Sequence, residues 1–194
     1  MVADIGIKSI LDVGCGRGIS TSWFHLHDVE TLCVEGSHDA VESSVLPPEI
    51  TTEHDFSRGP WWPPRTVDAI WCVELLEHVG RNFHKNLIPT FRKAALIYAT
   101  HSTWGGWHHV EVHTTEWWIW KFESYGFKYS ESLTLEARGK AQIYKDDMAP
   151  NEMPYRAQHL RLHLMVSSNF HIVPLFFPIA PNIYLVHRCS STLW

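Results

Sequence analysis

The sequence has no uninterrupted hydrophobic run of the length that spans a membrane, which is about 20 residues. Its most apolar segment, Ile172 to Val186, is interrupted by Pro174, Pro178 and Pro181. The first ten residues, MVADIGIKSI, do not join a charged start to an apolar stretch, so they predict no secretory signal. We therefore expect a soluble, cytoplasmic protein without a membrane span.

Basic residues and paired cysteines are also scarce. The 16 Lys and Arg residues are outnumbered by 21 Asp and Glu residues, which gives a formal net charge of −5. Because nucleic-acid binding needs a basic surface to neutralise phosphates, this balance disfavours a nucleic-acid substrate. No two cysteines form a CxxC pair, and three of the four lie in hydrophobic segments, which predicts free thiols rather than a disulfide framework. The four are Cys15, Cys33, Cys72 and Cys189.

The sequence does contain a regular alternation of short apolar runs and helix-like stretches. Its 194 residues suffice for one domain with a substantial core. Nearly continuous apolar strands separated by helices predict a parallel sheet that is covered on both faces. The expected strands are 8–13, 31–34, 50–53, 67–73 and 94–100, and the expected helices are 19–26, 39–45, 86–93 and 115–125.

The pattern is weaker beyond residue 126. Residues 127–135 alternate between apolar and polar, which predicts the start of an antiparallel hairpin at one edge of the sheet. Residues 139–156 are polar and turn-rich, and residues 160–166 and 183–187 are further candidate strands. We expect residues 1–194 to form a single domain with its core in 7–135, and edge strands and a C-terminal segment of undefined role in 136–194.

A Gly-rich turn lies between the first expected strand and the first expected helix. Glycines let the backbone approach a ligand closely, so such a corner is typical of nucleotide-binding folds. A dinucleotide fingerprint would need a glycine where Ile19 stands, and a P-loop would need a Lys that this turn lacks. The observed pattern is Asp-x-Gly-x-Gly-x-Gly, formed by Asp12, Gly14, Gly16 and Gly18, with Cys15 inside it.

This turn resembles the first motif of class I S-adenosylmethionine-dependent methyltransferases, and acidic residues follow in the order of that family. The dipeptide Glu35-Gly36 closes the second strand, and Asp55-Phe56 follows the third. The fourth strand leads into VELLEH at residues 73–78, whose Leu-Glu-His is typical of the small-molecule-type members. The resemblance covers about residues 7–135.

The resemblance implies a fold, a cofactor and a set of contacts. The fold would be a Rossmann-like three-layer α/β/α sandwich with a mostly parallel seven-stranded sheet and an antiparallel edge hairpin. The cofactor would be S-adenosylmethionine, with its ribose hydroxyls on Glu35 and its adenine beside Asp55 and Phe56. The other implied contacts are Asp12, Gly14, Cys15, Gly16, Gly18, Gly36, Val73, Glu74 and His78.

Candidates for catalysis lie where the strands end, because open α/β sheets bind ligands at their carboxyl ends. These ends carry Glu74, Glu77 and His78 after the fourth strand and His101 after the fifth. The loop of residues 101–113 holds four histidines and two tryptophans. One interpretation makes this loop a substrate cover that supplies a general base. The candidate bases are His109 and His101, with His108 as an alternative.

Two other interpretations of that loop stay open. Its histidines and Glu111 have suitable atoms for a metal ion, or the loop is simply polar and exposed. Metal-dependent methyltransferases usually need clustered carboxylates, and the sequence shows none. We therefore predict no metal ligand.

The acceptor of the methyl group is predicted only by class. In-line displacement gains mainly from close alignment of the methyl group with an oxygen or nitrogen nucleophile. Residues 72–75 read CVEL, which matches neither the motif of enzymes that methylate base amino groups nor that of cytosine-C5 enzymes. We expect a small-molecule acceptor. The oligomeric state is not predicted.

Two alternatives remain for the function. One is a non-catalytic domain that binds S-adenosylmethionine or a protein partner, and the other is a nicotinamide-dependent oxidoreductase. Only about ten residues precede the first motif, where many members of the family carry an extension over the substrate. We therefore expect either that later loops and the C-terminal segment form a lid, or that the chain is a fragment.

Overall fold

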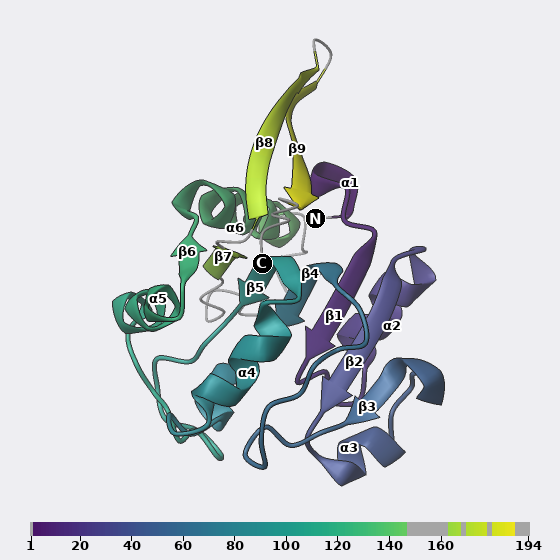
Figure 1. The fold of residues 1–194 in the computed structure, drawn as a ribbon, viewed down its shortest axis with the longest axis vertical. Coiled ribbons are helices and arrows are strands. Elements are labelled where there is room, and N and C mark those ends of the chain that lie inside the picture. The colour runs from purple at the N-terminus through teal and green to yellow at the C-terminus, as the bar shows by residue number, and fades with distance from the viewer. Residues whose placement is uncertain (1, 147–162, 168–169, 178–179, 189–194) are drawn as a thin grey trace, which may run out of the picture.

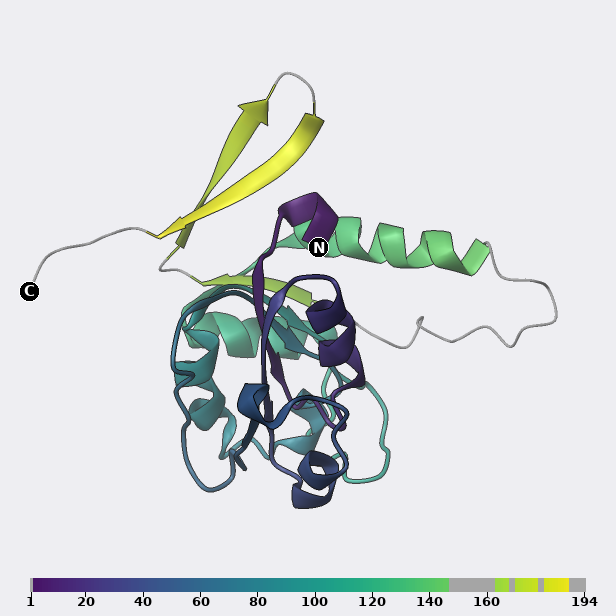
Figure 2. The same ribbon diagram turned by 90° about the vertical axis from the view of Figure 1, so that its right-hand side faces the viewer.

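A seven-stranded sheet lies between two layers of helices in the computed structural model, which describes residues 2–146, 163–167, 170–177 and 180–188 (Figures 1 and 2). The five strands predicted for the first 100 residues all form. The sheet has the order β3-β2-β1-β4-β5-β7-β6. Its strands are β1 (Ser9–Val13), β2 (Glu30–Glu35), β3 (Thr51–Glu53), β4 (Val67–Cys72), β5 (Ala94–Ala99), β6 (Phe127–Tyr129) and β7 (His163–Ser167).

The helices follow the predicted positions with small shifts at their ends. The helix of residues 19–26 has the predicted bounds, and the helix of 86–93 begins two residues earlier and includes Pro89. The helices are α1 (Val2–Ile5), α2 (Ile19–Leu26), α3 (His38–Glu42), α4 (His84–Phe91), α5 (Thr115–Ser124) and α6 (Glu131–Asp146), with 3-10 turns η1 (Pro48–Ile50) and η2 (Leu76–His78).

Strand alternation divides the core between the two faces of the sheet. On β4, Ile70 and Cys72 pack under α4 and α5, whereas Ala69 and Trp71 face α2 and α6. All six residues of β5 are buried, because this strand lies between β4 and β7 and is covered on both faces. This burial on both sides explains why the strands are nearly continuous apolar runs.

The order in which successive strands join the sheet reverses at β1. The strands β1 to β5 run parallel, and β2 and β4 lie on opposite sides of β1. Open sheets of this kind bind ligands at the carboxyl ends of the strands beside such a reversal. The topology therefore directs attention to the turns that follow β1, β2 and β4.

The far edge of the sheet differs from the prediction. Residues 127–135 do not continue as a strand, because α6 begins at Glu131. Leu133 and Ala137 are four residues apart and both pack against the core, which is helical spacing. The antiparallel strand is instead β7, which pairs with both β5 and β6. The predicted edge hairpin is thus two strands that are separated by α6 in the sequence.

The remaining strands form a separate hairpin. β8 (Phe170–Phe177) and β9 (Ala180–Arg188) pair with each other, and Figure 1 shows them projecting from the end of the sheet where the parallel strands begin. This hairpin lies away from the carboxyl ends of the strands. The described part of the C-terminal segment therefore does not cover the site expected there.

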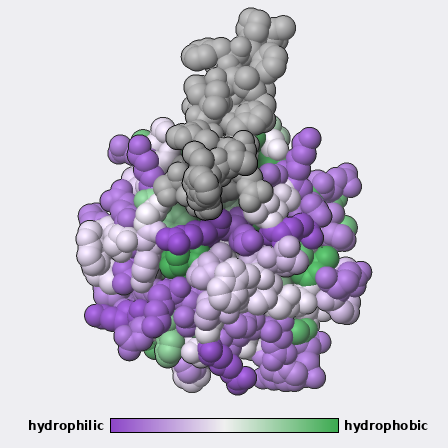
Figure 3. Space-filling view, in the orientation of Figure 1, coloured by the Kyte–Doolittle hydropathy of each residue, from purple (hydrophilic) through white to green (hydrophobic). Residues whose placement is uncertain are grey.

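The body of the domain shows a mainly polar face in Figure 3, with small separate hydrophobic spots. Among the described residues, none of the helices has the length and hydrophobicity that crossing a membrane requires.

Candidate functional site

A cavity of about 450 Å³ opens at the carboxyl ends of β1, β2 and β4. Its volume is in the usual range for small-molecule sites. Its walls come from the segments after β1, β2, β3 and β4. Six of the predicted cofactor contacts line it, namely Gly14, Glu35, Gly36, Asp55, Phe56 and His78.

The Gly-rich turn forms one wall of this cavity. Gly14 has a φ of 77°, and its backbone N–H donates to the carbonyl of Val34 at 2.8 Å. A Cβ atom at this position would lie 2.8 Å from Cδ1 of Leu75. Only glycine combines this backbone conformation with such a close approach of β1 to the segment after β4. At the other end of the turn, Gly18 is the N-cap residue of α2.

Glu35 fixes the turn to the end of β2. One carboxylate oxygen accepts a hydrogen bond from the backbone N–H of Gly16, and the other accepts from that of Ser37, both at 2.8 Å. Each oxygen keeps a second lone pair for a ligand hydroxyl. The side chain thus lies at the cavity wall in the position from which a carboxylate can hold a ribose.

Asp12 is not on the cavity surface. It is 2% exposed, and its carboxylate accepts a 2.6 Å hydrogen bond from the hydroxyl of Thr21 in α2. Burial raises the pKa of Asp12 to about 7, which the Thr21 bond opposes and the charge of Glu35 reinforces. Asp12 therefore has a structural role, because its bond to Thr21 joins β1 to α2 behind the Gly-rich turn.

The two residues of the dipeptide Asp55-Phe56, which follows β3, have different roles. Phe56 is buried and its ring forms an apolar wall of the cavity. Asp55 also lines the cavity, but its carboxylate accepts from both the backbone N–H and the hydroxyl of Ser57. These bonds lower the pKa of Asp55, and the bond from the Ser57 hydroxyl has the largest effect. The carboxylate is therefore ionised and fixed in its own turn.

The segment after β4 turns sharply. Glu74 has a φ of 54°, which is uncommon for a residue other than glycine. Its N–H donates to the hydroxyl of Thr100, and that hydroxyl donates to its carboxylate, both at 2.8 Å. This pair of bonds ties the ends of β4 and β5 together. Val73 precedes the turn, and neither Val73 nor Glu74 lines the cavity.

Glu77 lies inside η2 and is fully buried. Burial raises its pKa to about 7. Its backbone carbonyl accepts from the N–H groups of Val110 and Glu111, at 2.8 and 3.1 Å. The loop of residues 101–113 is thus bound directly to the segment after β4.

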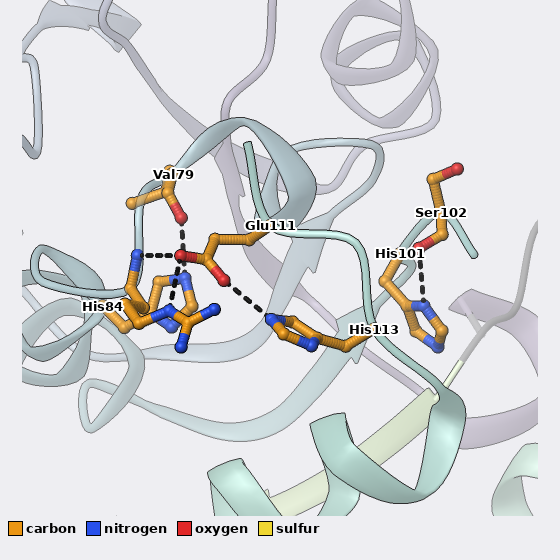
Figure 4. Close-up of polar contacts among 7 residues, drawn as sticks. Val79, His84, His101, Ser102, Glu111 and His113 are labelled. Atoms are coloured by element: carbon orange, nitrogen blue, oxygen red, sulfur yellow. Dashed lines mark hydrogen bonds and ion pairs between the residues drawn. The ribbon is translucent and has the colours of Figure 1, made fainter. Parts of the chain in front are cut away.

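The two predicted catalytic histidines occupy different environments. His101 is fully buried, and one ring nitrogen lies 3.3 Å from the Ser102 carbonyl (Figure 4). Its other ring nitrogen lies 3.4 Å from the Thr115 hydroxyl. It does not line the cavity. His109 is half-buried, and its ring meets that of His78, which does line the cavity, at a centroid distance of 4.9 Å. Only His109 therefore lies near the cavity rim.

A buried carboxylate holds the other end of the loop. The side chain of Glu111 accepts from the backbone and the guanidinium of Arg81, at 2.7 and 3.0 Å, and from His113 at 2.7 Å (Figure 4). Burial alone would raise the pKa of Glu111, but the bonds from Arg81 and His113 hold it at about 2. The His113 ring stacks on Trp117 with a centroid distance of 3.6 Å. Glu111 thus has a structural role here.

The structure corrects the prediction about cysteines. Cys15 and Cys33 form a disulfide, although we predicted free thiols. Cys15 directly follows the Gly14 turn and Cys33 lies in the adjacent strand β2, so their Cα atoms are 5.8 Å apart. Cys72 is free and buried, and Cys189 lies outside the described residues. Neither Cys15, Gly16 nor Gly18 lines the cavity, since these residues form the outer part of the turn.

Sequence reasoning missed most of the apolar lining of the cavity. It predicted Phe56, but its other predicted contacts were mainly glycines and polar or charged residues, whereas much of the lining is aliphatic or aromatic. The signal was present in the sequence VELLEHVG, in which four of the eight residues are aliphatic. The missed lining residues include Leu75, Val79, Phe83 and Val110.

The sheet order, the reversal of strand order at β1 and the cavity define a Rossmann-like α/β domain with a small-molecule site at the carboxyl ends of its strands. A family model described as a methyltransferase domain matches residues 6–142. The chain therefore belongs to this family, and its cofactor is S-adenosylmethionine. No curated protein matches the chain.

Solved structures share the fold at low sequence identity. The chain is similar to an S-adenosylmethionine-dependent methyltransferase from Archaeoglobus fulgidus (17% identity, 64% of this chain and 63% of that chain, TM-score 0.51). It is also similar to the plantazolicin methyltransferase BpumL in complex with a triazolic desmethylPZN analogue and SAH (16% identity, 83% of this chain and 77% of that chain, TM-score 0.54). A third similar structure is the [4+2]-cyclase SpnF (14% identity, 86% of this chain and 77% of that chain, TM-score 0.58). The chain thus spans less than two thirds of the Archaeoglobus protein.

Proposed function

We propose that this protein transfers the methyl group of S-adenosylmethionine to an oxygen or nitrogen atom of a small molecule. The observation that carries the proposal is the position of Glu35 at the cavity wall, where its carboxylate joins the Gly-rich turn to β2. A carboxylate with two remaining lone pairs suits the paired hydroxyls of a ribose. The cavity is large enough for a ligand of this kind.

The class of acceptor follows from charge. The net charge of −5 disfavours a polyanionic acceptor such as RNA or DNA. The loop of residues 101–113 reaches the rim of the cavity through Val110, and this supports a small acceptor held between the loop and the segment after β4. His109 stays our predicted general base, because of the two candidates it alone is accessible near the rim.

Calorimetry tests the cofactor part of the proposal. The wild-type protein should bind S-adenosylmethionine and S-adenosylhomocysteine, and it should not bind NAD. Glu35→Gln should weaken S-adenosylmethionine binding by about 1–3 kcal/mol, which is roughly 5- to 150-fold, because the amide has one accepting oxygen and its NH2 group can only donate. Glu42→Gln, an exposed change at the end of nearby α3, is the matched control and should leave the affinity unchanged. Equal affinities for the two variants would remove Glu35 from the site.

A methyl-transfer screen tests the acceptor part. The protein would be incubated with S-adenosylmethionine carrying a labelled methyl group and a small-molecule library, with transfer RNA and total protein as competing acceptors. Label in a small molecule supports the proposal, whereas label in RNA or protein alone overturns it.

A second function is supported by one observation. The [4+2]-cyclase SpnF has the same fold as this chain, so the fold also occurs in a protein named for a different reaction. A domain that binds S-adenosylmethionine without methyl transfer is therefore the second candidate. It would bind the cofactor in calorimetry and label none of the acceptor classes.

A further inference from the structure

Three side chains that can bind a metal converge beside the cavity. Glu77 and His78 come from η2, and His109 comes from the loop of residues 101–113. One ligand atom of each lies within 4.8 Å of the others. The sequence predicted no metal ligand because carboxylates are not clustered. The fold nevertheless brings His109 to a carboxylate and a histidine that precede it by more than 30 residues.

The burial of the Glu77 carboxylate is the first indication that this group of residues binds a ligand. Its side chain is fully buried, and neither carboxylate oxygen has a hydrogen-bond partner among the described residues. A buried ionised carboxylate without a partner is strongly unfavourable, so such groups take up a proton, pair with a cationic side chain or bind a metal ion. The guanidinium of Arg81, which follows η2 in the chain, binds Glu111 instead.

The two histidines are already oriented for binding. Nδ1 of His78 lies 3.0 Å from the carbonyl of His108, and Nδ1 of His109 lies 2.9 Å from that of Trp104. A carbonyl only accepts, so each Nδ1 carries the proton and each Nε2 keeps its lone pair. Metal-binding histidines in proteins are held in this way, with the second nitrogen donating to a carbonyl or carboxylate.

Gly106 leaves room for the His109 ring. A Cβ atom at residue 106 would lie 2.9 Å from Nε2 of His109. The loop therefore approaches the imidazole closely, and its backbone is fixed by the bonds of Glu77 to Val110 and Glu111. The rigid attachment of both segments keeps the three ligand atoms together.

We propose that Glu77, His78 and His109 bind one divalent first-row transition-metal ion, of the Mn²⁺ to Zn²⁺ series, at the rim of the cavity. Two imidazoles and one carboxylate suit these metals, whereas Mg²⁺ and Ca²⁺ prefer oxygen ligands alone. Three protein ligands leave coordination positions open, as in catalytic rather than structural sites. The ion would occupy the Nε2 lone pair that a general base needs, so in the metal-bound protein His109 is a ligand and not a base.

The site lies next to the expected acceptor. His78 and Val110 both line the cavity, so an ion on His78 faces its rim. If the proposed methyl transfer holds, the open positions would bind the acceptor through an oxygen atom. This consequence rests on the proposed function, but metal binding itself does not.

Direct metal titration tests the site. The protein, stripped with a chelator, would be titrated with Zn²⁺, Mn²⁺ and Mg²⁺ by calorimetry and with Co²⁺ by visible absorption. We expect one tight site for the transition metals and much weaker binding of Mg²⁺. Glu77→Gln and His109→Ala should each weaken binding by roughly tenfold or more. Gly106→Ala, which keeps all three ligands but crowds the His109 ring, should also weaken it.

The control is His108→Asn, in the same loop. His108 has a φ of 55°, which Asn tolerates, and its side chain is not in the group. It should bind metal as the wild type does. Absence of a stoichiometric site, equal loss in His108→Asn and His109→Ala, or binding of Mg²⁺ as tight as that of Zn²⁺ would overturn the proposal. Calorimetry of the stripped protein and variants with S-adenosylmethionine shows that they are folded, and it reports on the proposed function separately.

Discussion

Asp12 offers a test of the buried support beneath the Gly-rich turn. Its carboxyl group is 2% exposed and has one hydrogen bond, from Thr21. Its pKa is about 7 in the folded protein, against 3.8 for an unperturbed aspartic acid side chain. A raised pKa means that the unfolded chain loses its proton first. The stabilising contribution of the protonated group is therefore complete below pH 3.8 and is lost as the pH rises through 7.

The magnitude follows from these two pKa values. A difference of about three pH units corresponds to roughly 4 kcal/mol of unfolding free energy over the whole interval. Between pH 5 and pH 8 the expected loss is roughly 3 kcal/mol. This is a large share of the 5–15 kcal/mol by which domains are usually stable. Asp12→Asn mimics the protonated group, and its amide oxygen can still accept from the Thr21 hydroxyl.

Urea unfolding at pH 5, 6, 7 and 8 measures the effect in both proteins. The unfolding free energy of Asp12→Asn should fall less with pH than that of the wild type, so that the variant gains roughly 3 kcal/mol on the wild type by pH 8. Thr21→Val is the companion variant, because it removes the donor and keeps the acid. The reasoning is refuted if the difference between Asp12→Asn and the wild type is the same at pH 5 and pH 8.

Three further predictions concern the site and its supports. Gly14→Ala should destabilise the fold by about 1–2 kcal/mol through its positive φ, and should weaken S-adenosylmethionine binding in calorimetry because the new methyl group displaces Leu75. Trp118→Ala should lower the unfolding free energy by about 3–5 kcal/mol, since this ring is 1% exposed under the sheet, whereas the exposed Trp120→Ala should change it little. Glu111→Gln should cost about 1–3 kcal/mol in urea unfolding at pH 7, because it weakens two charged hydrogen bonds, and an unchanged stability would contradict the structural role of this network.

Local pattern was enough to predict the first two thirds of the domain. The buried parallel strands are continuous apolar runs, and the helices between them follow turn residues and carry periodic apolar faces that a local pattern can indicate. The turn at Gly14 and the acid at Glu35 could be placed because Gly14 directly follows β1 and Glu35 is the last residue of β2. Strand ends in a parallel sheet meet at one edge, so the order along the chain implied proximity in space.

The far edge of the sheet could not be predicted in the same way. Leu133 and Ala137 fit helical spacing, but residues 127–135 also alternate between apolar and polar. Whether this segment forms a helix or a strand depends on the surface against which it packs. β7 enters between β5 and β6 from residues 163–167, which are far away in the sequence. Pairing of this kind is decided by the open edge of β5 and not by local propensity.

The sequence by itself determined the Gly-rich turn, the acidic residue that ends β2 and the class of cofactor, because these depend on spacing within single strand-turn-helix units. Only the tertiary structure decided that Cys15 meets Cys33, that His101 is buried, and that Glu77 and His109 share one site. The physical reason is that these contacts join segments whose separation is fixed by packing of whole elements. Long loops such as residues 101–113 take their position from backbone bonds to distant segments, and no local pattern encodes those bonds.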